Sequence, residues 1–147
     1  MKKILITGFN GFVGRHACAE FRRRGYQIHG VSFGEITDEA RQLVDEVSAC
    51  DLSDPSQTSS LDLGGISAVL NLAGFATNTG GDGELIRKIN VGAHVNLYAH
   101  LQELGLKPRI IAVSSGSVYD PNQAMPETEE SNLKDVATAR PYEASKI

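Results

Sequence analysis

The chain has 147 residues, of which 41% are hydrophobic and 22% charged, and its formal net charge is −4. This composition suits one globular domain with its own core, and the acidic balance argues against nucleic acid or an anionic membrane as a partner, since both select basic surfaces. No apolar run reaches transmembrane length, and no signal peptide precedes the first apolar segment. We therefore expect a cytoplasmic protein whose two cysteines, Cys18 and Cys50, are buried thiols.

Three glycines dominate the N-terminal segment. Gly8, Gly11 and Gly14 follow a short apolar run, and the glycine turn leads into a helical pattern over residues 12–24. Glycine allows positive φ and lets a phosphate approach the backbone, while the free amides and dipole of a helix N-terminus attract an anion. The segment predicts a strand, a turn that holds a pyrophosphate and a helix, with an ordinary tight turn as the alternative.

The second and third predicted strands end in polar residues. The strand over 26–31 leads to Ser32, where dinucleotide folds carry an acid for a ribose hydroxyl or a basic residue for a 2′-phosphate. Neither stands there, so NAD and NADP both remain open. The strand over 47–50 leads to Asp51 and Leu52, which we interpret either as an adenine contact or as an ordinary turn.

The middle of the chain contains a short predicted helix over 39–45 and a fourth strand over 68–72 that runs into Leu72, Ala73 and Gly74. Small residues at this strand end would let a cofactor lie across it, and a tight exit turn is the alternative.

A polar loop over 77–83, which we expect to be flexible, precedes the longest helical pattern, residues 84–104. This pattern has two apolar faces, so we expect one to cover the sheet and the other to meet a partner subunit or a further helix. Asn90 lies within it and is interpreted as facing either solvent or the cofactor side.

The last third of the chain begins with a fifth predicted strand, 109–114, which ends in Ser114 and Ser115. A loop over 120–139 follows, longer than compact domains usually hold without a function for it. The segment 141–147 begins a helix of barely one turn, which we expect to be frayed.

Five strands alternating with helices predict a doubly wound parallel sheet of the α/β class, with ligand bound outside the carboxyl ends of the strands. The glycine turn and the polar residues at the other strand ends all fall on that edge. The histidines show no spacing typical of metal ligands, so we predict no metal site.

Two residues of the last segment carry a possible chemistry. Tyr142 and Lys146 stand four apart and project from one helix face, and Ser115 follows the fifth strand. A free tyrosine, with a pKa near ~10, is a poor base at neutral pH, but a neighbouring ammonium favours the phenolate. The trio suits proton transfer at a hydroxyl while hydride moves between carbon and a nicotinamide. A solvated helix face is the alternative reading of the Tyr-Lys pair alone.

These motifs together resemble the extended short-chain dehydrogenase/reductases, in particular the NAD-dependent epimerase/dehydratase group that acts on nucleotide sugars. The matching segments span the chain: Thr7-Gly8, Gly11-Phe12, Gly14, Asp51-Leu52, Leu72-Ala73-Gly74, Asn90-Val91, Ser114-Ser115, Val118-Tyr119, Pro141-Tyr142 and Ser145-Lys146. The chain departs from the family's pattern at Ser32-Phe33, where an acid or a basic residue is usual, and at Asp120, where glycine is usual.

The resemblance implies a Rossmann-type fold that binds NAD or NADP and acts on a nucleotide-linked sugar. It implies that Tyr142 is the acid/base, that Lys146 lowers the pKa of Tyr142 and binds the nicotinamide ribose, and that Ser115 binds the reacting oxygen. It also implies a set of residues lining the cofactor: Phe12, Val13, Asp51, Leu52, Ala73, Gly74 and Asn90.

Members of this group run to about twice this length, as two-domain chains commonly do. Residues 1–147 are therefore expected to be a dinucleotide-binding domain that stops before the last strands and the substrate-binding lobe. The exposed face of the 84–104 helix is expected to form a homodimer. Two alternatives to an enzyme remain: a non-catalytic dinucleotide-binding sensor or scaffold, and a cofactor-binding fragment without turnover.

Overall fold

The computed structural model describes residues 2–76, 82–123 and 125–147. Its centre is a five-stranded, all-parallel sheet with the strand order β3-β2-β1-β4-β5. The doubly wound parallel sheet predicted from the sequence is confirmed. The strands are β1 (Lys3–Thr7), β2 (Gln27–Ser32), β3 (Glu46–Ala49), β4 (Ile66–Asn71) and β5 (Arg109–Ala112). The helices are α1 (Phe12–Arg23), α2 (Asp38–Arg41), α3 (Pro55–Ser59), α4 (Gly83–Arg87), α5 (Ala93–Glu103) and α6 (Pro141–Ala144).

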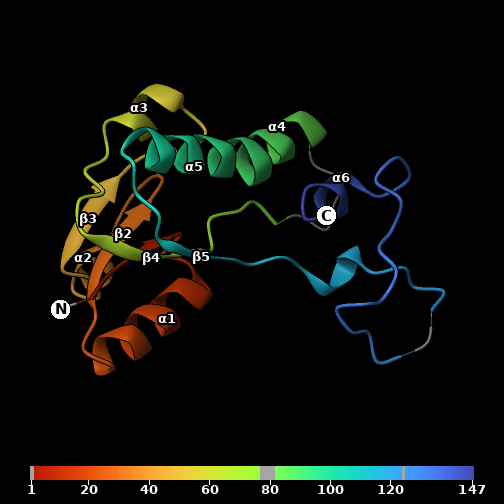
Figure 1. The fold of residues 1–147 in the computed structure, drawn as a ribbon, viewed down its shortest axis with the longest axis horizontal. Coiled ribbons are helices and arrows are strands. Elements are labelled where there is room, and N and C mark those ends of the chain that lie inside the picture. The colour runs from red at the N-terminus through yellow and green to blue at the C-terminus, as the bar shows by residue number, and fades with distance from the viewer. Residues whose placement is uncertain (1, 77–81, 124) are drawn as a thin grey trace.

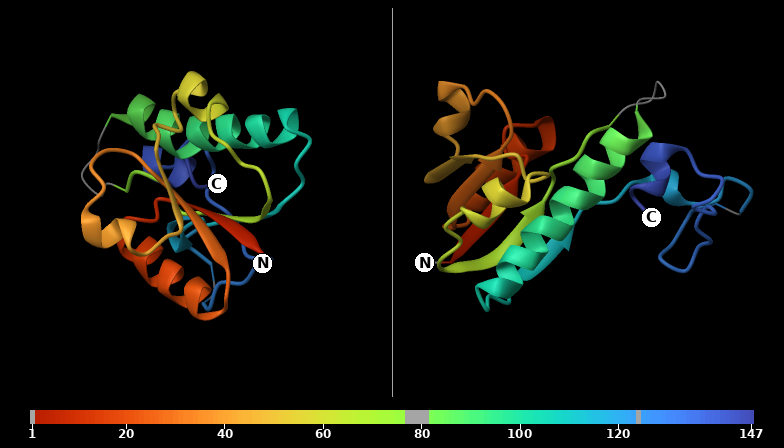
Figure 2. Two further views of the ribbon diagram at one scale, coloured as in Figure 1. Left: turned by 90° about the vertical axis from the view of Figure 1, so that its left-hand side faces the viewer. Right: turned by 90° about the horizontal axis from the view of Figure 1, so that it is seen from above.

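Helices cover both faces of the sheet. In Figures 1 and 2, α1 and α2 lie on one face, and α3, α4 and α5 lie on the other. The alternation of β1 explains this, because Ile4 and Ile6 pack with Cys18 of α1 on the first face, whereas Leu5 packs with Leu97 of α5 on the second. Cys18 and Cys50 are buried free thiols, as expected, and burial raises the pKa of both, that of Cys18 to about 11.

Two short helices differ from their predictions. The helix expected over 39–45 is limited to α2, which Thr37 caps through a hydrogen bond from the amide of Ala40. Helix α3 was not predicted, because its Asp-Pro start reads equally as a turn. Asp54 accepts hydrogen bonds from the Ser56 and Gln57 amides at 2.8 and 3.4 Å, and proline occupies the first helical turn.

The long predicted helix is confirmed as α4, a π-helical turn over Lys88–Gly92, and α5 in direct succession. Its inner stripe is buried against the sheet, whereas its outer face leaves Val91 and Val95 exposed at 37% and 58%. The predicted loop over 77–83 lies largely outside the described residues. Among the described residues, no helix combines the length and apolar character needed to span a bilayer.

The C-terminal segment extends away from the sheet (Figure 1). Strand β5 ends at Ala112, two residues before the predicted end, and a 3-10 turn over Gly116–Val118 follows. The loop expected over 120–139 contains an antiparallel bridge between Tyr119 and Leu133. Helix α6 is short, as predicted, and side chains from three other segments contact it, as described below. Its fraying stays a prediction.

Candidate functional site

The glycine turn links β1 to α1 at the carboxyl edge of the sheet. Gly8 has φ +66°, and its amide donates to the carbonyl of Val31 at 2.8 Å. A Cβ at Gly8 would lie 3.0 Å from the backbone nitrogen of Ala73, so β1 and the exit of β4 approach closely here. Helix α1 begins at Phe12 with no side-chain cap and no acidic residue in its first turn. Its N-terminal amides and dipole are therefore suited to an anion.

Beside this turn lies a cavity of about 480 Å³, a volume typical of small-molecule and cofactor sites. It follows the carboxyl ends of β1, β2, β3 and β4. Eight of the residues predicted to bind the cofactor line it: Gly8, Gly11, Ser32, Asp51, Leu52, Leu72, Ala73 and Gly74. The structure thus brings together residues from four strand ends, as the sheet topology requires.

The other residues predicted for the site do not line the cavity: Phe12, Val13, Gly14, Asn90, Ser114, Ser115, Tyr142 and Lys146. Phe12 and Val13 are exposed on the first turn of α1 at 82% and 58%. Gly14 is buried, and a Cβ there would overlap the Gly8 carbonyl, so it sets the packing of α1 on the turn. Asn90 and Ser114 lie behind the wall and hold neighbouring segments.

Hydrogen bonds hold the cavity wall at the end of β3 in place. One carboxylate oxygen of Asp51 accepts hydrogen bonds from the amide and hydroxyl of Ser53 at 2.9 and 2.7 Å, and the Asp51 amide donates to Gln57 of α3 at 3.0 Å. Leu52 is buried beside it. The missed helix α3 thus positions a predicted contact.

The end of β2 carries neither pattern that discriminates the adenosine ribose. Ser32 and Phe33 line the cavity, and Phe33 is 76% exposed. The nearby Asn10 side chain donates to the carbonyl of Glu35 at 3.2 Å and accepts from the Arg15 guanidinium at 2.8 Å. A cation and an acid therefore both lie near this strand end, and NAD and NADP both remain open.

Lys146 does not line the cavity, but its side chain lies beside Gly74, which does. Its Nζ is 3.5 Å from the carbonyl of Val113, and a Cβ built on Gly74 would lie 3.3 Å from the same Nζ. The ammonium is therefore located between the exits of β4 and β5. Burial lowers the pKa of Lys146 below its ordinary value. Ser114 donates from its hydroxyl to the carbonyl of Lys146 at 2.8 Å.

Ser115 and Tyr142, the other predicted catalytic residues, come from the two segments next to this lysine. The Ser115 hydroxyl is 2.8 Å from that of Ser117 and accepts from the Ser117 amide at 3.2 Å, which opens the 3-10 turn. Tyr142 is half-buried on α6, one helical turn before Lys146.

The Asn90 side chain connects the loop after β4 to the end of α6 by hydrogen bonds. Its Oδ1 accepts from the Phe75 amide at 2.6 Å, and its Nδ2 donates to the Phe75 carbonyl at 3.1 Å and to the Ser145 hydroxyl at 2.9 Å. The side chain is 2% exposed. Asn90 therefore does not face solvent, and it contacts the loop after β4 and the end of α6; its place on the cofactor side stays a prediction.

A buried polar chain beneath the cavity was not foreseen. Thr7 donates to Asn71 Oδ1 at 2.6 Å, and Asn71 Nδ2 donates to the Tyr98 hydroxyl at 3.0 Å. The amides of Leu72 and Ala73 both donate to the Thr7 hydroxyl, at 3.1 and 3.0 Å. The chain fixes the exit of β4, and sequence offers little signal for it because these residues lie in apolar runs.

His94 supports the same exit from α5. Its Nε2 lies 3.1 Å from the carbonyl of Ala73, and burial lowers its pKa below the ordinary value. Within the described ranges, no group of three or more His, Cys, Asp or Glu side chains is arranged to hold a metal ion.

Comparisons with solved structures show the fold to be widespread. The UDP-glucose-4-epimerase from Stenotrophomonas maltophila, solved with NAD and formylated UDP-arabinopyranose, superposes with a TM-score of 0.86 at 20% identity, covering 99% of this chain and 46% of that one. The UDP-Glc/GlcNAc 4-epimerase from Campylobacter jejuni gives 0.85 at 21% identity, with coverages of 99% and 46%. A short-chain dehydrogenase/reductase superfamily protein from Agrobacterium tumefaciens with bound NAD gives 0.80 at 29% identity, with coverages of 98% and 42%.

The chain thus spans about half the length of the solved structures that it matches. A comparison with curated proteins returns no match. The family model described as "NAD dependent epimerase/dehydratase family" matches residues 4–147. The chain belongs to the NAD dependent epimerase/dehydratase family.

Proposed function

We propose that residues 1–147 form the NAD(P)-binding domain of an enzyme that acts on a nucleotide-linked sugar as an epimerase, dehydratase or keto-reductase. The observation that carries this proposal is the carboxyl edge of the sheet, where the glycine turn borders the 480 Å³ cavity and the Lys146 ammonium lies beside Gly74 of the cavity wall. Membership of the family and the UDP-sugar epimerases among the similar structures support the substrate class. The substrate lobe would be contributed by chain outside these residues.

The cavity fits a dinucleotide in an extended pose. The uncapped N-terminus of α1 would receive the pyrophosphate, because its amides and dipole favour an anion. Asp51 and Leu52 would hold the adenine end, and Lys146 the ribose at the other end. A Cβ at Gly74 would lie 3.3 Å from both the Lys146 ammonium and Asn90 Oδ1, so a larger residue there would crowd both side chains. When bound, the nicotinamide supplies a hydride acceptor or donor.

Three side chains would carry the proton chemistry. Tyr142 would take the proton from a sugar hydroxyl or return it to a carbonyl oxygen, with Lys146 favouring the phenolate through its positive charge. Ser115 would hydrogen-bond the same oxygen and orient it. Ser115 lies on the segment that leaves β5, Tyr142 on α6, and Lys146 two residues after the end of α6.

The direct test is titration calorimetry of the chain with NADH and NADPH, followed by assays of UDP-glucose and UDP-galactose with the whole protein that carries it. Micromolar binding of one nicotinamide cofactor is expected, and the preferred form would settle the role of Ser32. A chain that binds neither cofactor would refute the proposal.

We also propose that the outer face of α4 and α5 forms a homodimer. Val91 and Val95 are exposed there, which favours self-association. Val95→Glu is expected to shift a dimer to monomer in sedimentation velocity, because a carboxylate would be buried without a partner. Arg87→Glu, at an exposed position on the same helix, tests whether a change of charge alone has this effect. A wild-type monomer at high concentration would count against the interface.

A further inference from the structure

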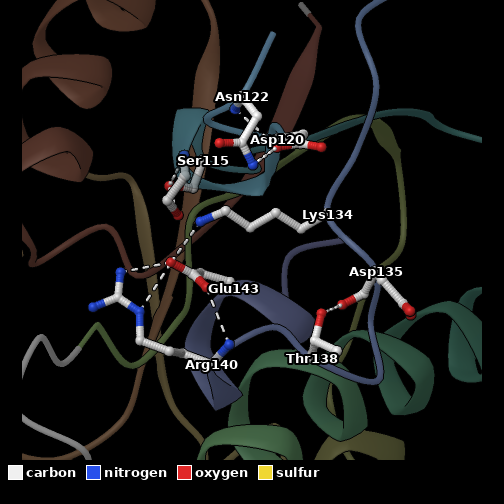
Figure 3. A network of polar contacts seen from close by, with 9 residues as sticks. Ser115, Asp120, Asn122, Lys134, Asp135, Thr138, Arg140 and Glu143 are labelled. Atoms are coloured by element: carbon white, nitrogen blue, oxygen red, sulfur yellow. Dashed lines mark hydrogen bonds and ion pairs between the residues drawn. The ribbon is translucent and has the colours of Figure 1, made fainter.

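Glu143 is a nearly buried acid beside the candidate catalytic tyrosine, and no motif of the family predicted a role for it. Its side chain is 4% exposed, yet three charged or polar groups converge on it (Figure 3). Lys134 Nζ donates to Oε1 at 2.8 Å, the Arg140 guanidinium donates to the same oxygen through Nε at 3.0 Å, and the Arg140 amide donates to Oε2 at 3.0 Å. These donors hold the pKa of Glu143 far below its ordinary range, at about 2.

Lys134 connects this carboxylate to the segment that carries Ser115. The Lys134 amide donates to the carbonyl of Val118 at 2.8 Å, and the Val118 amide donates to the carbonyl of Ser115 at 3.2 Å. The antiparallel bridge between Tyr119 and Leu133 joins the same two segments of the chain. A short path therefore runs from Glu143 through Lys134 to the turn that presents Ser115.

Asp120 strengthens that path. Glycine is usual at this position, but Asp120 has a negative φ and its carboxylate accepts from the Asn122 amide at 2.9 Å. Its own amide donates to the carbonyl of Asn132 at 2.9 Å. The loop is thus folded back on the 3-10 turn, which brings Lys134 to α6.

Helix α6 depends on such contacts because it has only four residues, fewer than a helix needs to persist alone in water. Asn90 holds Ser145, and Ser114 holds the carbonyl of Lys146. Both bonds lie on the C-terminal side of Tyr142. The Glu143 carboxylate forms the ion pairs of α6, with Lys134 and Arg140. It also accepts a hydrogen bond from the Arg140 amide, which completes a capping box at the start of the helix.

We infer that Glu143 is a positioning residue: its carboxylate, shared by Lys134 and Arg140, fixes α6 against the Ser115 turn and so places Lys146 at the nicotinamide end of the cavity. This inference rests on the proposed function, which assigns Lys146 to the cofactor. Removing the carboxylate leaves the Lys134 and Arg140 cations facing each other, and their repulsion pushes the segment that carries Lys134 away from α6. The proposed contacts to adenine and pyrophosphate, Asp51, Leu52 and the N-terminus of α1, lie on other segments, and the hydrogen bonds of Glu143 do not reach them.

The test compares NADH, which reaches Lys146, with ADP, which fills only the adenine and pyrophosphate half, by calorimetry. Glu143→Gln is expected to weaken NADH about tenfold, in line with loss of charge-assisted hydrogen bonds, and to leave ADP unchanged. Lys134→Met is also expected to weaken NADH binding. Glu20→Gln is the matched control, because Glu20 also holds two arginines and has a pKa of about 2, but lies on α1 far from the cluster.

Lys146→Ala separates this inference from the proposed function. It is expected to weaken NADH and spare ADP, and Glu143→Gln added to it is expected to have no further effect, because both changes act through the same contact. Normal NADH binding by Glu143→Gln, equal losses for NADH and ADP, or a full further loss in the double variant would overturn the positioning role. Normal NADH binding by Lys146→Ala, or none by the wild type, would instead overturn the proposed function and this inference with it.

Discussion

Tyr142→Phe is expected to reduce turnover of a UDP-sugar by the whole protein by about 10²- to 10⁴-fold, the usual contribution of a general acid or base. The phenol is the proposed proton carrier, and phenylalanine keeps its ring while removing the hydroxyl. NADH affinity is expected to stay within about twofold, because the lost group acts on the sugar oxygen. Steady-state kinetics and NADH calorimetry on the same preparation measure both quantities.

Tyr26→Phe is the control for this change. Tyr26 precedes β2 and packs edge-on to Phe21, with ring centroids 5.2 Å apart, at the end of the sheet away from the cavity. Tyr26→Phe also removes one phenolic hydroxyl, but far from the cavity, and should leave turnover unchanged. Turnover by Tyr142→Phe equal to wild type would rule out the proposed acid/base, and a parallel loss of NADH affinity would point to a displaced α6 instead.

The sheet could be predicted because its signals are local. The apolar run of β1, the three-residue spacing of the glycines after it and the small residues after β4 are each readable over a few positions, and parallel topology then brings the strand ends together. The two apolar faces of the 84–104 helix were readable in the same way. The exposed Val91 and Val95 on one face and the buried Leu97 on the other follow from that pattern.

The errors arose where two structures share one sequence signal. Asp54-Pro55 begins a helix but is also typical of a turn, and the choice depends on how Gln57 contacts Asp51 across the loop. The fraying predicted for α6 followed from its length alone. The contacts of α6 with Asn90, Ser114 and Lys134 join it to residues that lie 7 or more positions away in sequence and cannot be paired with it from periodicity.

The candidate site divides in the same manner. Residues that line the cavity, such as Gly8, Asp51 and Gly74, stand next to strand ends and could be found from sequence. Residues that hold the site in place could not, because Thr7 and Glu143 act through side-chain bonds to segments far along the chain. Sequence therefore indicates what touches a ligand better than what supports it.

Gly14→Ala is expected to lower the free energy of unfolding by about 1–3 kcal/mol, the cost of overpacking a tight contact, and to abolish measurable NADH binding. Its Cβ would lie 2.6 Å from both Cα and O of Phe9 and would overlap the carbonyl of Gly8. These are backbone atoms of the turn itself, so α1 must move away from β1. Because the chain has no tryptophan, urea unfolding followed by circular dichroism measures the stability.

Gly92→Ala is the matched control for that substitution. Gly92 has helical dihedrals, φ −57° and ψ −44°, and a Cβ there meets no atom within 4 Å. It is expected to stabilise the chain by about 0.5–1 kcal/mol, since alanine loses less backbone entropy in a helix. Equal behaviour of the two variants would show that α1 can shift without cost. A Gly14→Ala chain that is destabilised yet binds NADH normally would show that the pyrophosphate does not depend on the seating of α1, and would remove the glycine turn from the proposed site.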